Sequence, residues 1–211
     1  MLIAINADYP EPRKIQRAVD ALERGELIAY PTDTLYGIGC DIGNKRALDR
    51  LMAIKGRAKP VPPSFICHDL SDISRYAIVD DSVYRELKHL LPGPYTFVLI
   101  AKPTVPRLLQ TKRRTVGIRV PLHPIPLALA RALGRPIAST SATYNDEALI
   151  DSNEIDERFP GLALVLDGGI GGMLPTSIID MTESPPVVLR EGMGPVAPFE
   201  EAPPMSRQWM K

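Results

Sequence analysis

The stretch LIAYPTDTLYGIG at residues 27–39 constrains the fold of this chain more than any other. Its first four residues are apolar and have the length of a buried strand. Pro31 ends that strand because it has no N–H to donate. Three small polar residues follow, and Gly37 and Gly39 then allow a tight turn or the close approach of a ligand. A buried strand that runs into a hydroxyl-rich turn is typical of ligand sites in open α/β sheets. An ordinary strand-to-helix turn explains this stretch alone equally well.

Apolar runs and helical patterns alternate along the rest of the chain. The predicted strands are residues 2–5, 27–30, 65–67, 95–101, 115–120, 137–141, 162–166, 176–180 and 187–190. The predicted helices are residues 12–24, 44–55, 69–76, 82–91, 105–110, 124–133 and 154–159. Gly25 and Gly134 stop two of these helices, and Asn44 can cap a third. The alternation predicts an α/β fold, and because some connections are too short for crossovers, the sheet should be mixed.

Length and charge limit the classes of function that the chain can have. The 211 residues are enough for one domain, expected over residues 1–196, before a Pro-rich, loosely ordered tail over residues 197–211. Lys+Arg and Asp+Glu number 25 each, so the net charge is zero. This argues against nucleic-acid binding over the whole surface but leaves room for a local basic patch. The N-terminus does not resemble a signal peptide, and no apolar segment approaches the roughly 20 residues that span a bilayer. We therefore expect a soluble cytoplasmic protein without membrane contact.

Common cofactor motifs are absent from the sequence. It contains neither a G-x-x-x-x-G-K-[ST] phosphate loop nor a G-x-G-x-x-G after a strand. Cys40 and Cys67 form no C-x-x-C pair and imply no disulfide framework. No Cys/His cluster suggests zinc. The scattered His68, His89 and His123 are expected to be structural or on the surface.

Cations and hydroxyls instead recur where predicted elements end. They are Lys55 and Arg57, Thr115 and Arg119, Ser139, Thr140 and Ser141, and Arg190. Arginine can grip a carboxylate or phosphate with two donors, and hydroxyls donate to phosphate oxygens. A site of cations and hydroxyls without a nucleophile–base pair suits an anionic substrate and catalysis by positioning. Taken singly, each cation is more often a solvated surface charge. Arg119 is the exception, because an arginine inside an apolar strand needs a partner.

Eight ordered blocks of the sequence carry a family resemblance. They are YPTDTLYG, KGR, PGPYTFVL, TVGIRVP, STSA, the segment around DGG, PTSIID and PVVLREG. Over about residues 12–195 the chain resembles the YrdC/TsaC family, whose best-known members are threonylcarbamoyl-adenylate synthases. The segments SFICHDLSDIS and LLQTKRRTVGIRVP are most similar to the YciO branch. The resemblance implies a single-domain, twisted, open mixed sheet with flanking helices and a concave ligand-binding face.

The resemblance also implies substrates and partners. In the family reaction the amine of L-threonine takes up bicarbonate, and the carbamate attacks the α-phosphate of ATP to give threonylcarbamoyl-AMP and pyrophosphate. The enzyme aligns this attack and neutralises the triphosphate with the help of Mg²⁺. No protein-bound structural metal is implied. A second set of proteins then passes the threonylcarbamoyl group to tRNA.

Residue roles follow from the same resemblance. The residues implied to bind threonine are Thr34, Arg119 and Thr176. The residues implied to bind the nucleotide are Lys55, Arg57, Thr115, Ser141 and Arg190. Those implied in catalysis are Lys55, Arg57 and Ser141. The guanidinium of Arg119 should accordingly point into a cleft and meet the substrate carboxylate.

Three positions depart from typical synthases. Thr143 stands where the synthases have the asparagine of an S-x-N motif, and Asn145 comes two residues later. Val61 replaces a polar residue that helps to hold the nucleotide. A histidine that some members use for threonine falls near Ile66, and His68 lies two positions on. The frame of cations and hydroxyls remains.

The alternative function is a YciO-type paralogue that binds RNA, either double-stranded RNA or tRNA, through its concave face. The feature that favours it is the run Lys112, Arg113 and Arg114, with Arg107 and Lys102 nearby. Three adjacent cations are usually a solvated loop, and the zero net charge tempers this hypothesis.

Overall fold

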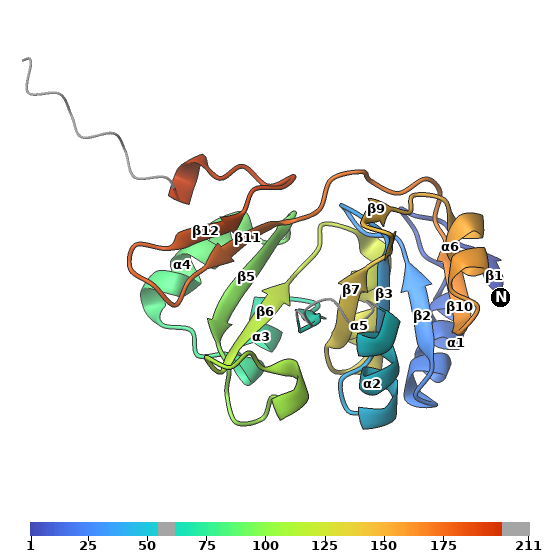
Figure 1. The fold of residues 1–211 in the computed structure, drawn as a ribbon, viewed down its shortest axis with the longest axis horizontal. Coiled ribbons are helices and arrows are strands. Elements are labelled where there is room, and N and C mark those ends of the chain that lie inside the picture. Colours follow the sequence, from blue (N-terminus) through green and yellow to red (C-terminus); the bar gives the residue numbers. More distant parts are fainter. Residues whose placement is uncertain (55–61, 200–211) are drawn as a thin grey trace, which may run out of the picture.

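Ten strands form one mixed sheet in the computed structural model, which describes residues 1–54 and 62–199 (Figure 1). The strands of this sheet are β1 (Leu2–Ala4), β2 (Leu27–Tyr30), β3 (Gly37–Asp41), β4 (Ser64–Ile66), β5 (Tyr95–Ile100), β6 (Thr115–Arg119), β7 (Ile137–Ser141), β10 (Leu162–Asp167), β11 (Ser177–Asp180) and β12 (Val187–Arg190). The helices are α1 (Pro12–Glu23), α2 (Lys45–Ile54), α3 (Leu70–Tyr76), α4 (Asp81–Leu90), α5 (Pro124–Leu133) and α6 (Ser152–Arg158). Gly25 and Gly134 end α1 and α5 with positive φ angles, as predicted.

The sheet combines parallel and antiparallel pairs, which confirms the predicted mixed α/β fold. Its strand order is β1-β10-β2-β3-β7-β4-β6-β5-β11-β12. Four pairs are parallel: β1 with β10, β10 with β2, β4 with β6, and β5 with β11. The remaining neighbours are antiparallel. The β2–β3 pair is a hairpin, because the segment between the two strands is too short for a crossover.

Alternating side chains give the sheet two different faces. In β2, Leu27 and Ala29 belong to one hydrophobic core, and Ile28 and Tyr30 belong to the other. The first core lies between the sheet and side chains of α2, α3, α4 and α6. The second lies between the sheet and helices α1 and α5. The sequence pattern of a strand buried on both faces is thereby explained.

One half of the second face carries no helix among the described residues. The core beneath α1 and α5 includes no side chain of β5, β6 or β11. In β6, Val116 and Ile118 point into the opposite core. Because side chains alternate along a strand, Gly117 and Arg119 must lie on the half that α1 and α5 leave open. This open half holds the polar residues considered next.

Gly37 and Gly39 do not form a turn, which was one of the two roles expected for them. Both lie in β3, which pairs antiparallel with β2. A Cβ atom at Gly37 would lie 3.0 Å from both the Tyr30 ring and the Ser139 hydroxyl oxygen. A Cβ atom at Gly39 would lie 2.6 Å from a methyl group of Ile137. The glycines therefore let side chains of β2 and β7 pack across β3, and the turn of residues 31–36 joins two strands, not a strand and a helix.

Two further features differ from the expectations. The 3-10 helix η2 (Ala197–Phe199) packs on the sheet, and Phe199 is buried against Tyr95 and Phe97. Residues 197–199, which were expected in the loosely ordered tail, therefore pack on the sheet. Residues 200–211 lie outside the described residues. The sequence patterns also did not predict the small hairpin that β8 (Thr143–Tyr144) forms with β9 (Glu147–Ala148). Among the described residues, no helix has the length and apolar character needed to cross a membrane.

Candidate active site

A polar pocket opens on the half of the sheet that α1 and α5 leave uncovered. Its polar lining comes from Tyr36, Ser64, Thr96, Arg119, Ser139, Thr140, Ser141, Thr176 and Arg190. These residues belong to strands β4, β5, β6, β7 and β12 and to the segments that precede β3 and β11. The sheet topology thus brings together residues that are far apart in the sequence. Of the predicted site residues, Arg119, Ser141, Thr176 and Arg190 line this pocket.

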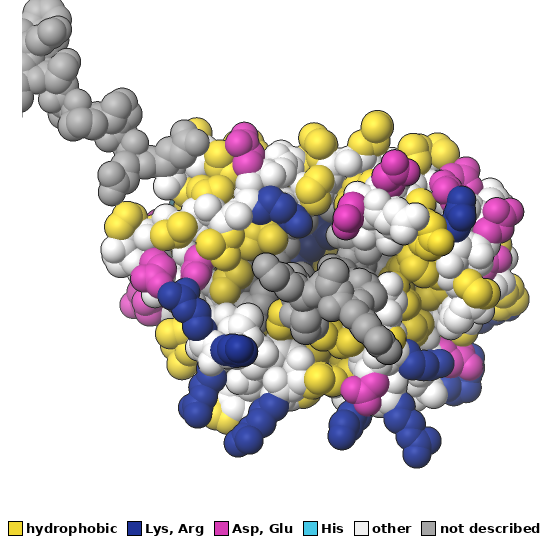
Figure 2. Space-filling model, viewed as in Figure 1, with side chains coloured by type: hydrophobic (Ala, Val, Ile, Leu, Met, Phe, Trp, Pro, Cys, Tyr) yellow, Lys and Arg dark blue, Asp and Glu magenta, His cyan; other side chains and the backbone are white. Residues whose placement is uncertain are grey.

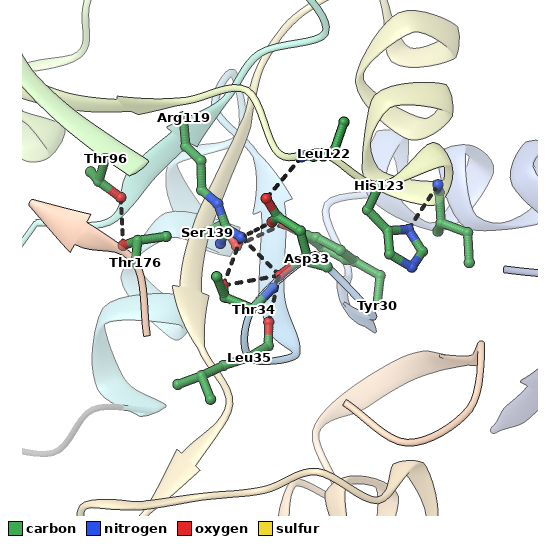
Figure 3. Close-up of polar contacts among 12 residues, drawn as sticks. Tyr30, Asp33, Thr34, Leu35, Thr96, Arg119, Leu122, His123, Ser139 and Thr176 are labelled. Atoms are coloured by element: carbon green, nitrogen blue, oxygen red, sulfur yellow. Dashed lines mark hydrogen bonds and ion pairs between the residues drawn. The ribbon is translucent and has the colours of Figure 1, made fainter. Parts of the chain in front are cut away.

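Arg119 lies at the centre of the site (Figure 3). It is 8% exposed, and its guanidinium nitrogen Nη2 donates to the hydroxyl oxygens of Thr32 at 2.9 Å and Thr34 at 2.7 Å. The same nitrogen forms an ion pair with Asp33. The turn after β2 therefore holds Arg119 with three consecutive side chains. Thr34 contacts Arg119 directly, which brings these two predicted threonine-binding residues together.

Asp33 is the site residue that the sequence analysis missed. One oxygen of its carboxylate accepts from Arg119, and the other accepts from the backbone N–H of Leu122 at 2.9 Å. The carboxylate therefore joins the β2–β3 turn to the segment that follows β6. We expected the partner of Arg119 to be a substrate carboxylate, but the protein supplies one of its own. The argument that a buried arginine needs a partner could have identified Asp33, because it is the one carboxylate in YPTDTLYG.

Arg119 nevertheless keeps donors that no described residue uses. Its Nε atom is buried and has no hydrogen-bond partner among the described residues. A buried donor without an acceptor costs free energy on the order of 1–3 kcal/mol. The Arg119 side chain lines the pocket, so an anion bound there would lie beside its positive charge. The expected orientation of Arg119 toward a cleft is therefore consistent with the geometry.

Arg190 brings a second guanidinium to the same pocket. Its Nε and Nη2 atoms donate to the backbone oxygen of Thr176 at 2.9 and 2.7 Å. The Thr176 hydroxyl is in turn 2.9 Å from that of Thr96. Partial desolvation, followed by the like charge of Arg119, lowers the pKa of Arg190 below its usual value. Two guanidinium groups that repel each other across a pocket favour the binding of an anion.

Hydroxyls of β7 complete one wall of the pocket. Ser139 accepts a hydrogen bond from the buried Tyr30 hydroxyl at 2.7 Å, and burial raises the pKa of that tyrosine. Thr140 has a buried hydroxyl with no partner among the described residues. Ser141 is half-buried and lines the pocket. Hydroxyls placed in this way can donate to the oxygens of a bound phosphate.

Thr115 and Thr143, which the sequence also singled out, are not brought into this pocket. Thr115 lies at the end of β6 opposite Arg119, and its hydroxyl is 2.6 Å from that of Thr111. Thr143 lies in the small β8–β9 hairpin. Ile66 lines the pocket, whereas the His68 ring lies beside Asp72. Lys55, Arg57 and Val61 fall outside the described residues.

Comparison with known proteins identifies the family. The model of the Sua5, YciO and YrdC proteins, described as "Telomere recombination", matches residues 20–192. The chain belongs to the Sua5/YciO/YrdC family. It is 42% identical to the Escherichia coli "Uncharacterized protein YciO" over 92% of this chain and 97% of that protein. The crystal structure of E. coli YciO superimposes with a TM-score of 0.91 over 95% of this chain and 99% of the other, at 40% identity. These similarities confirm the predicted fold and family.

The structure of a second relative contains a bound ligand. The structure of Pyrococcus abyssi Sua5 complexed with L-threonine matches with a TM-score of 0.83 and 31% identity, over 91% of this chain and 57% of the longer Sua5 chain. A P. abyssi protein named threonylcarbamoyl-AMP synthase is 33% identical over 95% of this chain and 61% of its own length. This chain therefore spans little more than half of those two longer chains.

Proposed function

We propose that this protein is a threonylcarbamoyl-AMP synthase. The amine of L-threonine would add to the carbon of bicarbonate, with loss of water, to give a carbamate. A carbamate oxygen would then attack the α-phosphorus of ATP while the bond to the β-phosphate breaks. The products would be threonylcarbamoyl-AMP and pyrophosphate. The carbamate is itself the nucleophile, so the protein would align and neutralise charge and would need no covalent intermediate.

The observation that carries this proposal is the partly satisfied guanidinium of Arg119. Its buried Nε has no acceptor among the described residues, and its side chain lines the pocket that Thr176 also lines. The P. abyssi Sua5 complex shows that a relative of this fold binds L-threonine. We infer that the threonine carboxylate meets Arg119 and that Thr34 and Thr176 close the same subsite.

The nucleotide would occupy the same pocket. Ser141 and Arg190 belong to its lining and would contact the nucleotide. Lys55 and Arg57 would hold its phosphates, an assignment that comes from the family resemblance. Thr115 does not line the pocket, so its role also rests on the resemblance alone. Burying a triphosphate beside several cations replaces its hydration with fixed charges, which is how the site would favour the transition state.

Mg²⁺ is proposed as part of the nucleotide substrate. Among the described residues, no group of three or more His, Cys, Asp and Glu side chains is arranged to hold a metal ion. The ion would therefore enter bound to the phosphate oxygens of ATP. Such substrates are cytoplasmic, and the product would pass to proteins that transfer the threonylcarbamoyl group to tRNA.

Calorimetric titration of threonine and ATP tests this assignment. Arg119→Lys keeps the positive charge but loses the two-pronged donor, so it should weaken threonine binding by about 10-fold. ATP binding should change little, because other cations hold the nucleotide. A folded variant that binds threonine as well as the wild type would show that Arg119 does not hold the carboxylate.

RNA binding is a second candidate function, favoured by an excess of cations in one loop. Residues 102–114 carry five Lys and Arg residues and no Asp or Glu. Figure 2 shows Lys and Arg side chains gathered along the lower edge, over the β5–β6 loop and α2. If RNA binds, its affinity should fall steeply with added salt. Replacing Lys112, Arg113 and Arg114 with Ala should weaken binding to all RNA sequences, and an affinity unmoved by both changes would exclude this function.

A further inference from the structure

A second hollow lies in the loop between β5 and β6. It has a volume of about 490 Å³, a size typical of ligand pockets. Its charged lining consists of Lys102, Arg107 and Arg114, and Gln110 and Thr111 add polar groups. It shares no lining residue with the candidate active site. The hollow is therefore a separate feature of the molecule.

The three cations are uncompensated within the described part of the chain. In residues 1–54 and 62–199, no Asp or Glu lines the hollow, and none of the three cations forms an ion pair. Arg113, their neighbour in sequence, differs: it lies 3.7 Å from a carboxylate oxygen of Asp180 and 3.5 Å from one of Glu183. The loop therefore places one arginine beside acidic partners, whereas the other three cations belong to the lining of the hollow.

The loop holds its shape through its own backbone and two apolar anchors. Val105 and Leu109 are buried in the first hydrophobic core, on the side of the sheet that α2, α3, α4 and α6 cover. The backbone of Arg114 accepts from the N–H of Ala101 and donates to the oxygen of Thr111, both at distances below 3 Å. These backbone and apolar contacts restrict the positions of the cations. The entropic cost of holding an anion between them is therefore lower.

The backbone at Arg114 is the least expected feature of this loop. Its φ angle is +57°, in the left-handed region that favours glycine. Strain of this kind often marks a functional position. Lys102 is also held, because its ammonium donates to the backbone oxygen of Ser74. An ammonium has three donors, so two remain available to a ligand.

We propose that this hollow is a phosphate-binding site. Its ligand is a phosphate group held by Arg107 and Arg114 through charge-assisted hydrogen bonds, with Lys102 as a point charge. Arginine forks fit the tetrahedral arrangement of phosphate oxygens, and the polar rim supplies further donors. Two sources share this chemistry: the phosphodiester backbone of RNA, and a free diphosphate or phosphate ion. The site is independent of catalysis in the other pocket.

The test uses inorganic diphosphate, a short RNA duplex and two variants of the full chain. Arg107→Ala combined with Arg114→Gly removes both guanidinium groups, and glycine adopts the left-handed backbone without strain. Arg113→Ala is the matched control, since it removes one cation of the same loop that faces acidic partners. Diphosphate is titrated while the backbone amide resonances of residues 101–115 are followed by NMR, which separates this hollow from the other pocket.

The proposal predicts saturable shifts of these amides in the wild type and in Arg113→Ala. In the double variant the affinity should fall by about 10-fold or more. RNA binding that falls in parallel identifies RNA as the source, whereas RNA binding that stays unchanged, or is absent, identifies a free phosphate compound. Absence of shifts in the wild type overturns the proposal. Equal losses in the control and the double variant do so too, because they indicate loop charge alone.

Discussion

Replacing Asp33 with Asn removes the charge that compensates Arg119. In the wild type both carboxylate oxygens of Asp33 are used, one by Arg119 and one by the N–H of Leu122. Both side chains of the ion pair are about nine-tenths buried. Removing one partner of a buried pair typically costs about 3–5 kcal/mol, because an uncompensated charge remains. Asn keeps one acceptor oxygen, so we expect a loss of about 3 kcal/mol in the free energy of unfolding.

The same substitution should improve the binding of a carboxylate ligand. In Asp33→Asn, Arg119 and Arg190 share the pocket without a resident anion, so the carboxylate of threonine would replace the missing charge. We expect threonine to bind about 10-fold more tightly, and saturating threonine then restores about 1.4 kcal/mol of stability beyond its effect on the wild type. The assay is urea unfolding with and without L-threonine, followed by circular dichroism.

A matched control exists in a second ion pair of the same chemistry. Asp41 accepts from Arg135 at 2.8 and 2.6 Å, outside the pocket. Asp41→Asn should also destabilise the protein, but threonine should restore no more stability than it gives the wild type. If threonine rescues both variants equally, or rescues neither beyond the wild-type effect, then Arg119 does not meet the ligand carboxylate. A loss below about 1 kcal/mol in Asp33→Asn would refute the burial argument itself.

Three further substitutions test other parts of the structure. Ser141→Ala should lower pyrophosphate release by about 10-fold at an unchanged melting temperature, because Ser141 lines the pocket. Activity measured beside thermal unfolding checks this. Gly37→Ala should cost about 1–3 kcal/mol in urea unfolding, since its methyl group would meet the Tyr30 ring. Burial lowers the pKa of His123 below its usual 6.5, so the fold favours the neutral ring and stability should fall as the pH drops below 6.5. His123→Asn keeps an acceptor at the start of α5 but cannot titrate, so stability curves at pH 7.5 and 5 should lie closer together than for the wild type.

Regular elements of this fold were predictable because their patterns are local. Helix α1 has its apolar residues at helical spacing, and Gly25 follows its C-cap residue Arg24. Strand β3 escaped prediction because it contains two glycines, which are more frequent in turns. The long-range contact between Tyr30 and Ser139 across β3 explains why glycine is needed at Gly37, and this contact is not visible in the local sequence pattern.

The candidate site was predictable in its chemistry more than in its geometry. The cations and hydroxyls at the ends of strands indicated an anion site, and the topology does bring Arg119, Ser141 and Arg190 together. The ion pair with Asp33 could not be derived from spacing, since it joins β6 to the turn after β2, and β2 and β6 are not neighbours in the sheet. Phe199 was likewise missed, because a Pro-rich context conceals a single buried side chain.

The most direct test of the proposed function is the release of pyrophosphate from ATP by the purified wild-type protein. We predict release when ATP, Mg²⁺, L-threonine and bicarbonate are all present, together with a product whose mass equals that of threonylcarbamoyl-AMP. Omitting either threonine or bicarbonate should abolish both signals, and Arg119→Lys should reduce both at the same threonine concentration. Pyrophosphate release that does not depend on threonine, or a folded protein that releases none with all substrates present, would contradict the proposal.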